Sequence, residues 1–237
     1  MDKPVYQRVL IKISGEALAG EKKTGFDFEV VTRVCRAVKE AVGLGVQVGI
    51  VIGGGNFWRG VKDGAGKVER VSADRMGMLA TAMNCLAVCD VFKQIGAKAR
   101  VMTAVDIQGV GERYDTRKSI EYLEDGQIVL FACGTGSPFF STDTGAVLRA
   151  LEIGAEAILL AKNVDGVYDD DPRVNSAAVK FDSIRYDEVL ARRLAVMDST
   201  ATSLAMDNRI PVEVFALAEP DNILRVLRGE KIGTSVY

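Results

Sequence analysis

The 237-residue chain is long enough for one large α/β domain or two small ones, and 48% hydrophobic residues can fill a substantial core. Thirty basic and 32 acidic residues give a net charge of −2 without a block of like charge, which argues against a nucleic-acid or membrane surface. The sequence shows no secretory apolar stretch, and no run approaches the roughly 18 apolar residues of a membrane span. We therefore expect a globular cytoplasmic protein that binds small ligands.

Six apolar runs predict strands, and stripes of apolar residues at helical spacing lie between them. The strands are expected at Arg8–Ser14, Val46–Ile52, Ala99–Thr103, Gln127–Ala132, Ala157–Ala161 and Val212–Phe215. The clearest helical stripes run from Val30 to Ala41 and from Ala146 to Gly154. This alternation predicts an α/β fold, a three-layer α/β/α sandwich with a mostly parallel central sheet. We expect one domain with two lobes, residues 1–150 and 151–237.

The four cysteines are dispersed, and the chain has no histidine that could join them around a zinc ion. Cys85 and Cys89 lie one helical turn apart in the apolar segment 78–92. Free cysteine packs readily as a small hydrophobe, so both are expected to be buried thiols and not metal ligands.

Small and polar residues collect where three of the predicted strands end, which is where open α/β sheets bind ligands. These places are Ser14-Gly15, Gly53 to Asn56 and residues 134–143. Three glycines at 53–55 would let backbone N–H groups approach a phosphate, with Arg59 adding a forked cation; the alternative is a plain tight turn. Because the glycines mainly need the absence of side chains, Gly54→Val is expected to damage turnover more than stability.

Two common phosphate-binding motifs are absent from the sequence. Gly66-Lys67 is followed by Val68, and position 61 is valine, so there is no P-loop. The glycine clusters lack the third glycine of the dinucleotide fingerprint. Lys12, near the end of the first strand, could neutralise a polyphosphate beside the glycine-rich turns, although a lysine there can also lie along apolar surface.

Several segments together resemble the motifs of bacterial uridylate (UMP) kinases in the amino acid kinase superfamily, and the resemblance spans nearly the whole chain. The segments are Lys12 to Leu18, Ile52 to Gly60, Asp74 to Thr81, Gly134 to Asp143, Val164 to Tyr168 with Asp171-Pro172, and Val196 to Asp198. Lys-x-Ser-Gly and Gly-Gly-Gly-Asn are shared across the superfamily. The Asp74 segment and the Gly134 loop are more particular to the uridylate branch.

The resemblance implies an amino acid kinase-like fold and transfer of the γ-phosphoryl group of ATP to UMP, in pyrimidine nucleotide biosynthesis, with Mg²⁺ carried mainly by the nucleotide phosphates. No metal-ligating residue is assigned. Phosphoryl transfer mainly requires positioning and charge neutralisation. A phosphate monoester with a second pKa near ~6 is already largely dianionic at neutral pH, so no general base is needed.

The resemblance also implies roles for individual residues. Catalytic roles fall on Lys12, Arg59, Asp143 and Asp198. ATP binding falls on Lys12, Ile13, Ser14, Gly15, Gly55, Arg59, Asn163, Tyr168 and Asp171. UMP binding falls on Gly54, Asp74, Thr135, Gly136, Ser137, Pro138, Phe139, Phe140, Ser141 and Thr142, with Asp74 accepting a hydrogen bond from the ribose. The first lobe would then hold UMP and the oligomer face, and the second lobe ATP.

Alternatives remain for some of these residues. Asp143 either orients Lys12 or lies near magnesium, and it could also cap the helix at 146–154; Asp198 could likewise be a helix cap. Some relatives carry a threonine at this place in the segment Ala161-Lys162-Asn163, and either Lys162 or Asn163 could replace it; we assign the nucleotide contact to Asn163.

Phe139 and Phe140 either anchor the proposed UMP loop in the core or stack on the base. The resemblance further implies a homohexamer formed through the apolar segment Met76 to Ile95, which could instead be a core helix. GTP would activate, with the polar loop Gly20 to Gly25 taking part, and UTP would inhibit. Two rival functions are another amino acid kinase acting on a carboxylate or carbamate, and a nucleotide-binding homologue without catalysis.

Overall fold

A nine-stranded sheet organises the part of the chain that the computed structural model describes, residues 3–58 and 66–237. The order across the sheet is β4-β3-β5-β2-β1-β6-β10-β11-β9, and every neighbouring pair is parallel except β10 with β11. The strands are β1 Arg8–Ile13, β2 Gln47–Ile52, β3 Ala99–Thr103, β4 Glu112–Arg113, β5 Ile128–Ala132, β6 Ala157–Lys162, β9 Ser183–Ile184, β10 Val212–Ala216 and β11 Thr234–Val236. A separate antiparallel hairpin pairs β7 Val167–Tyr168 with β8 Lys180–Phe181.

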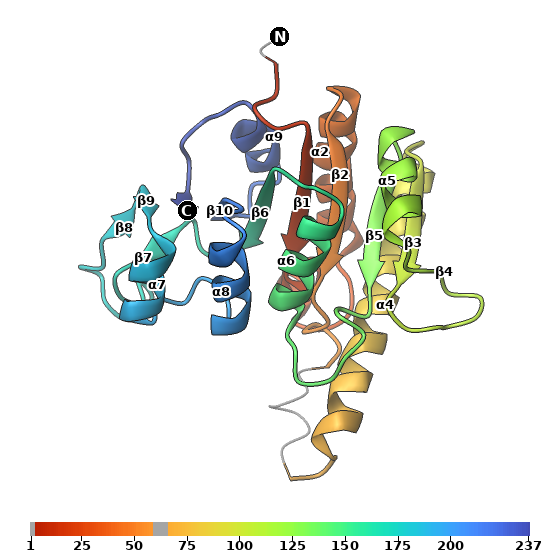
Figure 1. Ribbon diagram of the computed structural model, residues 1–237, viewed down its shortest axis with the longest axis horizontal. Helices are drawn as coiled ribbons and strands as arrows, with labels where there is room; N and C mark the ends of the chain where they lie inside the picture. Colours follow the sequence, from red (N-terminus) through yellow and green to blue (C-terminus); the bar gives the residue numbers. More distant parts are fainter. Residues whose placement is uncertain (1–2, 59–65) are drawn as a thin grey trace.

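Helices cover both faces of this sheet and complete the predicted three-layer sandwich (Figure 1). One face packs against α2, α4 and α9, and the other against α5, α6, α7 and α8. The bounds are α1 Gly15–Leu18, η1 Gly20–Lys22, α2 Phe28–Gly43, α4 Arg70–Gln94, α5 Thr116–Glu124, α6 Thr142–Glu152, α7 Tyr186–Arg192, α8 Ser199–Asp207 and α9 Asn222–Leu227. An apolar cluster lies on each face of the sheet. Both clusters include residues of the central strands, because these strands are buried on both sides.

All six predicted strands are confirmed, with bounds that differ by at most one residue at either end. The five strands that the sequence did not predict, β4, β7, β8, β9 and β11, are two or three residues long. Segments this short cannot display an apolar period, so their pairing depends on the rest of the sheet.

Strand alternation in β1 decides where Lys12 points. Val9, Ile11 and Ile13 belong to the cluster under α2 and α4, whereas Leu10 belongs to the cluster under α6. Lys12 is two residues after Leu10, so its side chain leaves the sheet on the α6 side. In register, Lys12 lies between Val51 of β2 and Leu160 of β6, near the carboxyl edge of the sheet.

The long helix α4 combines a buried side with an exposed apolar side, and its first turns extend past the carboxyl edge of the sheet (Figure 1). Its exposed apolar residues, Met76, Leu79, Met83 and Leu86, recur at helical spacing. By length and composition α4 is the one described helix that could cross a membrane, and more than half of its apolar stretch is buried inside the protein. A core helix passes the same test, and no membrane span was predicted from the sequence.

The four cysteines are buried and unpaired, as expected for packing residues. Burial raises the pKa of the Cys35 thiol to about 12 and that of Cys133 to about 11. Thiols held in this way are neutral near pH 7 and serve as small apolar side chains.

Candidate active site

An ion pair between Lys12 and Asp143 lies at the carboxyl end of β1. Lys12 Nζ is 2.5 Å from Asp143 Oδ1, and the two side chains are 12% and 19% exposed. Asp143 Oδ1 is buried and accepts no hydrogen bond of ordinary geometry from the described residues, so the contact is an ion pair. It joins a central strand to the first turn of α6.

The helix cap that the sequence offered to Asp143 belongs to Ser141. Ser141 Oγ accepts hydrogen bonds from the N–H groups of Asp143 and Thr144, and Asp143 itself is already in the first helical turn. The prediction that Asp143 caps the helix is therefore wrong. Its carboxylate is left available for Lys12, near the positive end of the α6 dipole.

The glycine turn, residues 53–56, needs its glycines for close packing as well as for ligand access. A Cβ on Gly15 would lie 2.2 Å from the Gly53 carbonyl oxygen, and a Cβ on Gly54 would lie 2.9 Å from the Gly77 carbonyl oxygen and from Ala80 Cβ. Gly54→Val would therefore press against α4, so we expect it to cost stability as well as turnover.

A buried amide pair holds the glycine turn against α4. Asn56 and Asn84 exchange two hydrogen bonds of 2.9 and 2.8 Å, and they are 1% and 0% exposed. Asn84 Nδ2 also donates to the Gly53 carbonyl at 2.7 Å, and Asn56 Nδ2 to the Gly25 carbonyl at 2.8 Å. These bonds satisfy buried polar groups that would otherwise be costly, and they fix the position of the turn.

A cavity of about 230 Å³ opens beside the glycine turn, between α4 and the loop after β5. We call it the acceptor cavity. Of the residues predicted to bind UMP, it is lined by Gly54, Asp74, Thr135, Ser137, Phe140, Ser141 and Thr142. Gly136, Pro138 and Phe139 do not line it, whereas Gly55, expected on the ATP side, does.

Sequence reasoning missed several lining residues of the acceptor cavity, among them Trp58, Gly77, Thr81 and Cys133. Thr81 Oγ1 accepts a 2.8 Å hydrogen bond from the Cys133 N–H and so ties α4 to the start of the loop. The sequence did carry a signal for Thr81, because this residue ends the segment Asp74 to Thr81 that resembles a UMP kinase motif.

Asp74 holds the acceptor loop, residues 134–141, from the side of α4. Its carboxylate accepts 2.8 and 2.9 Å hydrogen bonds from Arg70 Nε and a 2.8 Å bond from the Phe139 N–H. Phe139 has φ 71° and is 65% exposed, and Phe140 is 51% exposed. The alternative in which these phenylalanines anchor the loop in the core is therefore wrong.

A second cavity, about 570 Å³, lies on the other side of the ion pair, and we call it the donor cavity. Of the residues predicted to bind ATP, it is lined by Lys12, Ser14, Asn163, Tyr168 and Asp171. Ile13 is fully buried in the core, and Gly15 is buried at the start of α1. Arg59, assigned to ATP and to catalysis, lies outside the described residues.

The sequence did not predict the contribution of α7 to the donor cavity. Lys162, which the sequence left as the alternative to Asn163, lines it together with Arg192, Arg193, Leu194 and Ala195. No local signal marks the last four, because they approach β6 only through the packing of α7 and the segment that follows it.

Asp198 connects α8 to the acceptor loop. It caps α8 by accepting a 3.1 Å hydrogen bond from the Ala201 N–H, which confirms the predicted cap. Its carboxylate also accepts bonds from the hydroxyls of Ser141 and Thr144. Asp198 therefore caps α8 and at the same time lies beside the candidate site.

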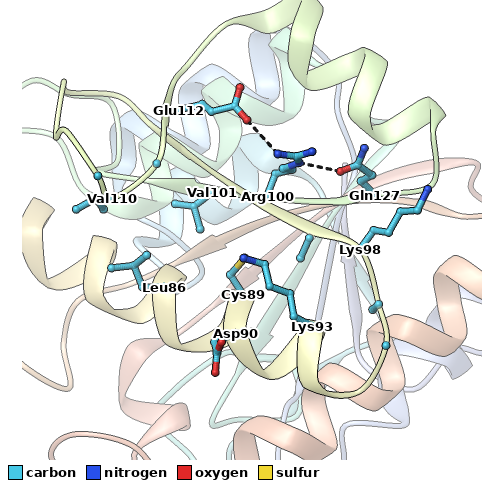
Figure 2. A pocket seen from close by; sticks show the side chains of 15 residues that line it. Leu86, Cys89, Asp90, Lys93, Lys98, Arg100, Val101, Val110, Glu112 and Gln127 are labelled. Atoms are coloured by element: carbon cyan, nitrogen blue, oxygen red, sulfur yellow. Dashed lines mark hydrogen bonds and ion pairs between the residues drawn. The ribbon is translucent and has the colours of Figure 1, made fainter.

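A third and more open hollow, about 1080 Å³, lies far along α4, between this helix and β3. Figure 2 shows Lys93, Lys98 and Arg100 around it, with Arg100 bonded to Glu112 and Gln127. The Lys118 ammonium, outside the lining, holds the pKa of the Glu112 carboxyl below its ordinary value. The hollow shares no lining residue with the donor or acceptor cavity.

Fold and site together define a class of protein. The sheet carries a lysine–aspartate pair and two cavities at its carboxyl edge. Residues 7–216 of the chain match the family model described as "Amino acid kinase family". The chain belongs to the amino acid kinase family and, within it, to the bacterial UMP kinases, as the following structures show.

Solved structures of three kinases are similar over almost the whole chain. The UMP kinase from Bacillus anthracis is 38% identical with a TM-score of 0.93, covering 98% of this chain and 96% of that one. The UMP kinase from Ureaplasma parvum is 35% identical with a TM-score of 0.91, covering 97% and 98%. The uridylate kinase from Archaeoglobus fulgidus is 26% identical with a TM-score of 0.73, covering 97% and 99%.

Proposed function

We infer that this protein is a uridylate kinase that transfers the γ-phosphoryl group of ATP to UMP, giving UDP and ADP. The observation that carries the inference is the position of the Lys12–Asp143 pair: Lys12 lines the donor cavity, while Thr142, next to Asp143, lines the acceptor cavity. A phosphoryl group crossing between two nucleotides would pass this pair. The similarity to two bacterial UMP kinases supports the same substrates.

Phosphoryl transfer mainly requires that the protein position the two nucleotides and neutralise charge on the transferring group. A UMP phosphate oxygen attacks the γ-phosphorus of ATP, the bond to the β,γ-bridging oxygen breaks, and that oxygen leaves with ADP. Lys12 stabilises the charge on the transferring group, and Asp143 orients the Lys12 ammonium. Because the attacking phosphate is already anionic, a site without histidine suffices.

We propose that the chain divides its work between two lobes, residues 1–150 for UMP and the oligomer face and residues 151–237 for ATP. Ser14 and Gly15 bind ATP phosphates with Lys12, and Asn163, Tyr168 and Asp171 lie toward adenine and ribose. Gly54, Asp74 and the acceptor loop bind UMP, and Asp198 completes the catalytic set by holding Ser141. Ile13, Gly55 and Arg59 keep their assignment to ATP as part of this proposal.

Mg²⁺ is the proposed cofactor, entering with ATP. Among the described residues, no group of three or more Cys, Asp or Glu side chains could hold a metal by itself. Mg²⁺ in kinases typically takes one or two carboxylates plus substrate phosphates, and the Asp143 carboxylate, which pairs with Lys12 through Oδ1, is the group that would lie beside the ion. Bound with ATP, the ion would supply charge neutralisation on the phosphate oxygens.

We also propose a homohexamer in the cytoplasm that serves pyrimidine nucleotide biosynthesis. The exposed apolar residues Met76, Leu79, Met83 and Leu86 on α4 support a face covered by a second copy. Sedimentation of the pure protein would test it, and a monomer at micromolar concentration would contradict it.

For regulation, we propose GTP as an activator and UTP as an inhibitor. The hollow in Figure 2 carries three cations, Lys93, Lys98 and Arg100, which suit a polyphosphate. UTP shares uracil and ribose with UMP, so it would compete at the acceptor cavity. The polar segment 20–25 touches the glycine turn through the Asn56–Gly25 bonds and could transmit the effect of GTP.

A panel of nucleoside monophosphates with ATP and Mg²⁺, followed by ADP release, tests donor, acceptor and reaction type together. We expect UMP-dependent turnover, with other monophosphates much slower. Turnover of acetylglutamate or aspartate without UMP would favour the carboxylate-kinase alternative. Tight binding of both nucleotides without ADP release would favour a non-catalytic homologue.

A further inference from the structure

Lys162 occupies an unusual position for a lysine, at the end of a central strand and beside the ion pair. It is the last residue of β6, whose Ala161 is in register with Ile13 of β1, so Lys162 lies next to the end of β1. Its backbone is fixed from the other side, where the Leu217 N–H donates to the Lys162 carbonyl at 2.8 Å. The strand therefore determines where this side chain starts.

The Lys162 ammonium donates hydrogen bonds to backbone carbonyls of the protein itself. Nζ donates to the carbonyl of Ala195 at 3.0 Å and also to the carbonyl of Val196. Both carbonyls belong to residues 194–198, the link between α7 and α8, which has no regular secondary structure. A charged donor to two carbonyls is among the stronger hydrogen-bonding arrangements in proteins, and here it adds to the burial of Val196 in fixing the link.

That link ends at Asp198, which is connected by hydrogen bonds to the Lys12–Asp143 pair. Asp198 accepts from Ser141, Ser141 accepts from the Asp143 N–H, and Asp143 pairs with Lys12. Because β1 and β6 are neighbours, the contacts from Lys162 through Asp198 to Lys12 close into a ring that spans both cavities.

Electrostatics agrees with this geometry. Burial lowers the pKa of Lys162 below its ordinary value of 10.5, Asp143 acts in the opposite direction, and the like charge of Lys12 lowers it further. Lys162 therefore interacts electrostatically with the Lys12–Asp143 pair, although its ammonium donates its hydrogen bonds to the link.

We propose that Lys162 is a positioning residue for phosphoryl transfer: it fixes residues 194–198 and thereby holds Asp198 and Ser141 where the acceptor loop and Asp143 need them. This assignment rests on the proposed kinase function and gives Lys162 a role other than direct contact with the nucleotide. It predicts an effect on the rate of transfer and not on the affinity for either nucleotide.

The test is a double-mutant cycle with Lys162→Met, Asp198→Asn and both changes together, each assayed for UMP-dependent ADP formation. Lys162→Met should lower kcat on the order of a hundredfold, as expected for misplaced catalytic groups, with the KM values for ATP and UMP nearly unchanged. The combined variant should be no slower than the slower single variant. Lys162→Arg, which keeps the charge and the donors, should recover most of the lost rate.

Lys39→Met is the matched control, because Lys39 Nζ also donates to a backbone carbonyl, that of Ile95 at 2.7 Å, far from the site. It should keep the wild-type rate. If Lys162→Met does not fold, Lys162→Gln, which retains an amide donor, replaces it in the cycle.

Three outcomes overturn the proposal: a raised KM for ATP with unchanged kcat, rate losses that multiply in the combined variant, or a Lys162→Arg variant as slow as Lys162→Met. An inactive wild-type protein would instead overturn the proposed function, so the two failures are distinguishable.

Discussion

The acceptor and donor cavities lie on two sides of one ion pair but are held in different ways. Beside the acceptor cavity, the glycine turn is fixed by Asn56 and Asn84, which are 1% and 0% exposed. Around the donor cavity, Asp171 pairs with Arg173 at side-chain exposures of 39% and 78%. Buried, fully satisfied amides fix geometry, whereas exposed ion pairs contribute about 0–1 kcal/mol each.

This difference follows from the elements that build each side. The acceptor side uses the end of β2 and the long helix α4, both part of the main core. The donor side shares the ends of β1 and β6, but most of its lining comes from residues 163–173 and 192–195, which include one strand of a hairpin outside the main sheet. We expect the acceptor side to be rigid before substrate binds and the donor side to adjust to ATP.

The largest expected effect is the loss of kcat on replacing Lys12, which lies between the two cavities. Lys12→Ala removes the cation at the point of transfer and should lower kcat by about 10²–10³-fold, the range for loss of one preorganised electrostatic stabiliser. Circular dichroism should show the fold retained, although Asp143 loses its partner. Lys39→Ala serves as the control for loss of a lysine. Activity within twofold of wild type would remove Lys12 from the catalytic set.

Asn84→Ala should sharpen the comparison on the acceptor side. It leaves the Asn56 side-chain oxygen and the Gly53 carbonyl without their buried donor, so the free energy of unfolding should fall by about 3 kcal/mol, measured by urea denaturation. The control is Asn208→Ala, because Asn208 is exposed and donates only to the Leu204 carbonyl at 2.9 Å. If both variants lose the same stability, the buried pair does not hold the turn.

Asp74→Ala tests how far the acceptor loop depends on α4. Removing the carboxylate frees the Phe139 N–H and should raise the KM for UMP about tenfold, near the free energy of one hydrogen bond to a charged group, with a smaller change for ATP. Asp106→Ala removes an exposed carboxylate that pairs with Arg113 and should leave both KM values unchanged. An equal rise for both nucleotides would mean that the loop is not specific to the acceptor.

The sequence predicted most of the acceptor side and only part of the donor side. Strand ends and glycine-rich motifs located Lys12, Gly54 and the acceptor loop, because β-strand periodicity is a local signal. Lys162 was a candidate only as the alternative to Asn163, and the contribution of α7 was not predictable, since it depends on packing between segments about 30 residues apart. Asp143 and Ser141 are both good capping types, and only the backbone conformation decides which one caps α6.

The smallest expected effect is the response of each side to acid. The Arg173 guanidinium lowers the pKa of Asp171, and the Asn175 amide lowers that of Asp170, both below the ordinary value of 3.8. Carboxylates with lowered pKa stabilise the fold above that value and lose this contribution as pH falls through their folded-state pKa. The Asn56–Asn84 pair that holds the glycine turn consists of neutral amides, which do not titrate there.

Hydrogen exchange at pH 5 and pH 3, corrected for intrinsic rates, should therefore show residues 169–175 losing protection severalfold while residues 53–57 keep theirs. Asp171→Asn should reduce this difference, because the substituted side chain no longer titrates. Equal loosening of both segments would mean that the acid response is global, and the contrast between a rigid acceptor side and an adaptable donor side would then have to rest on the Asn84 and Asp74 variants alone.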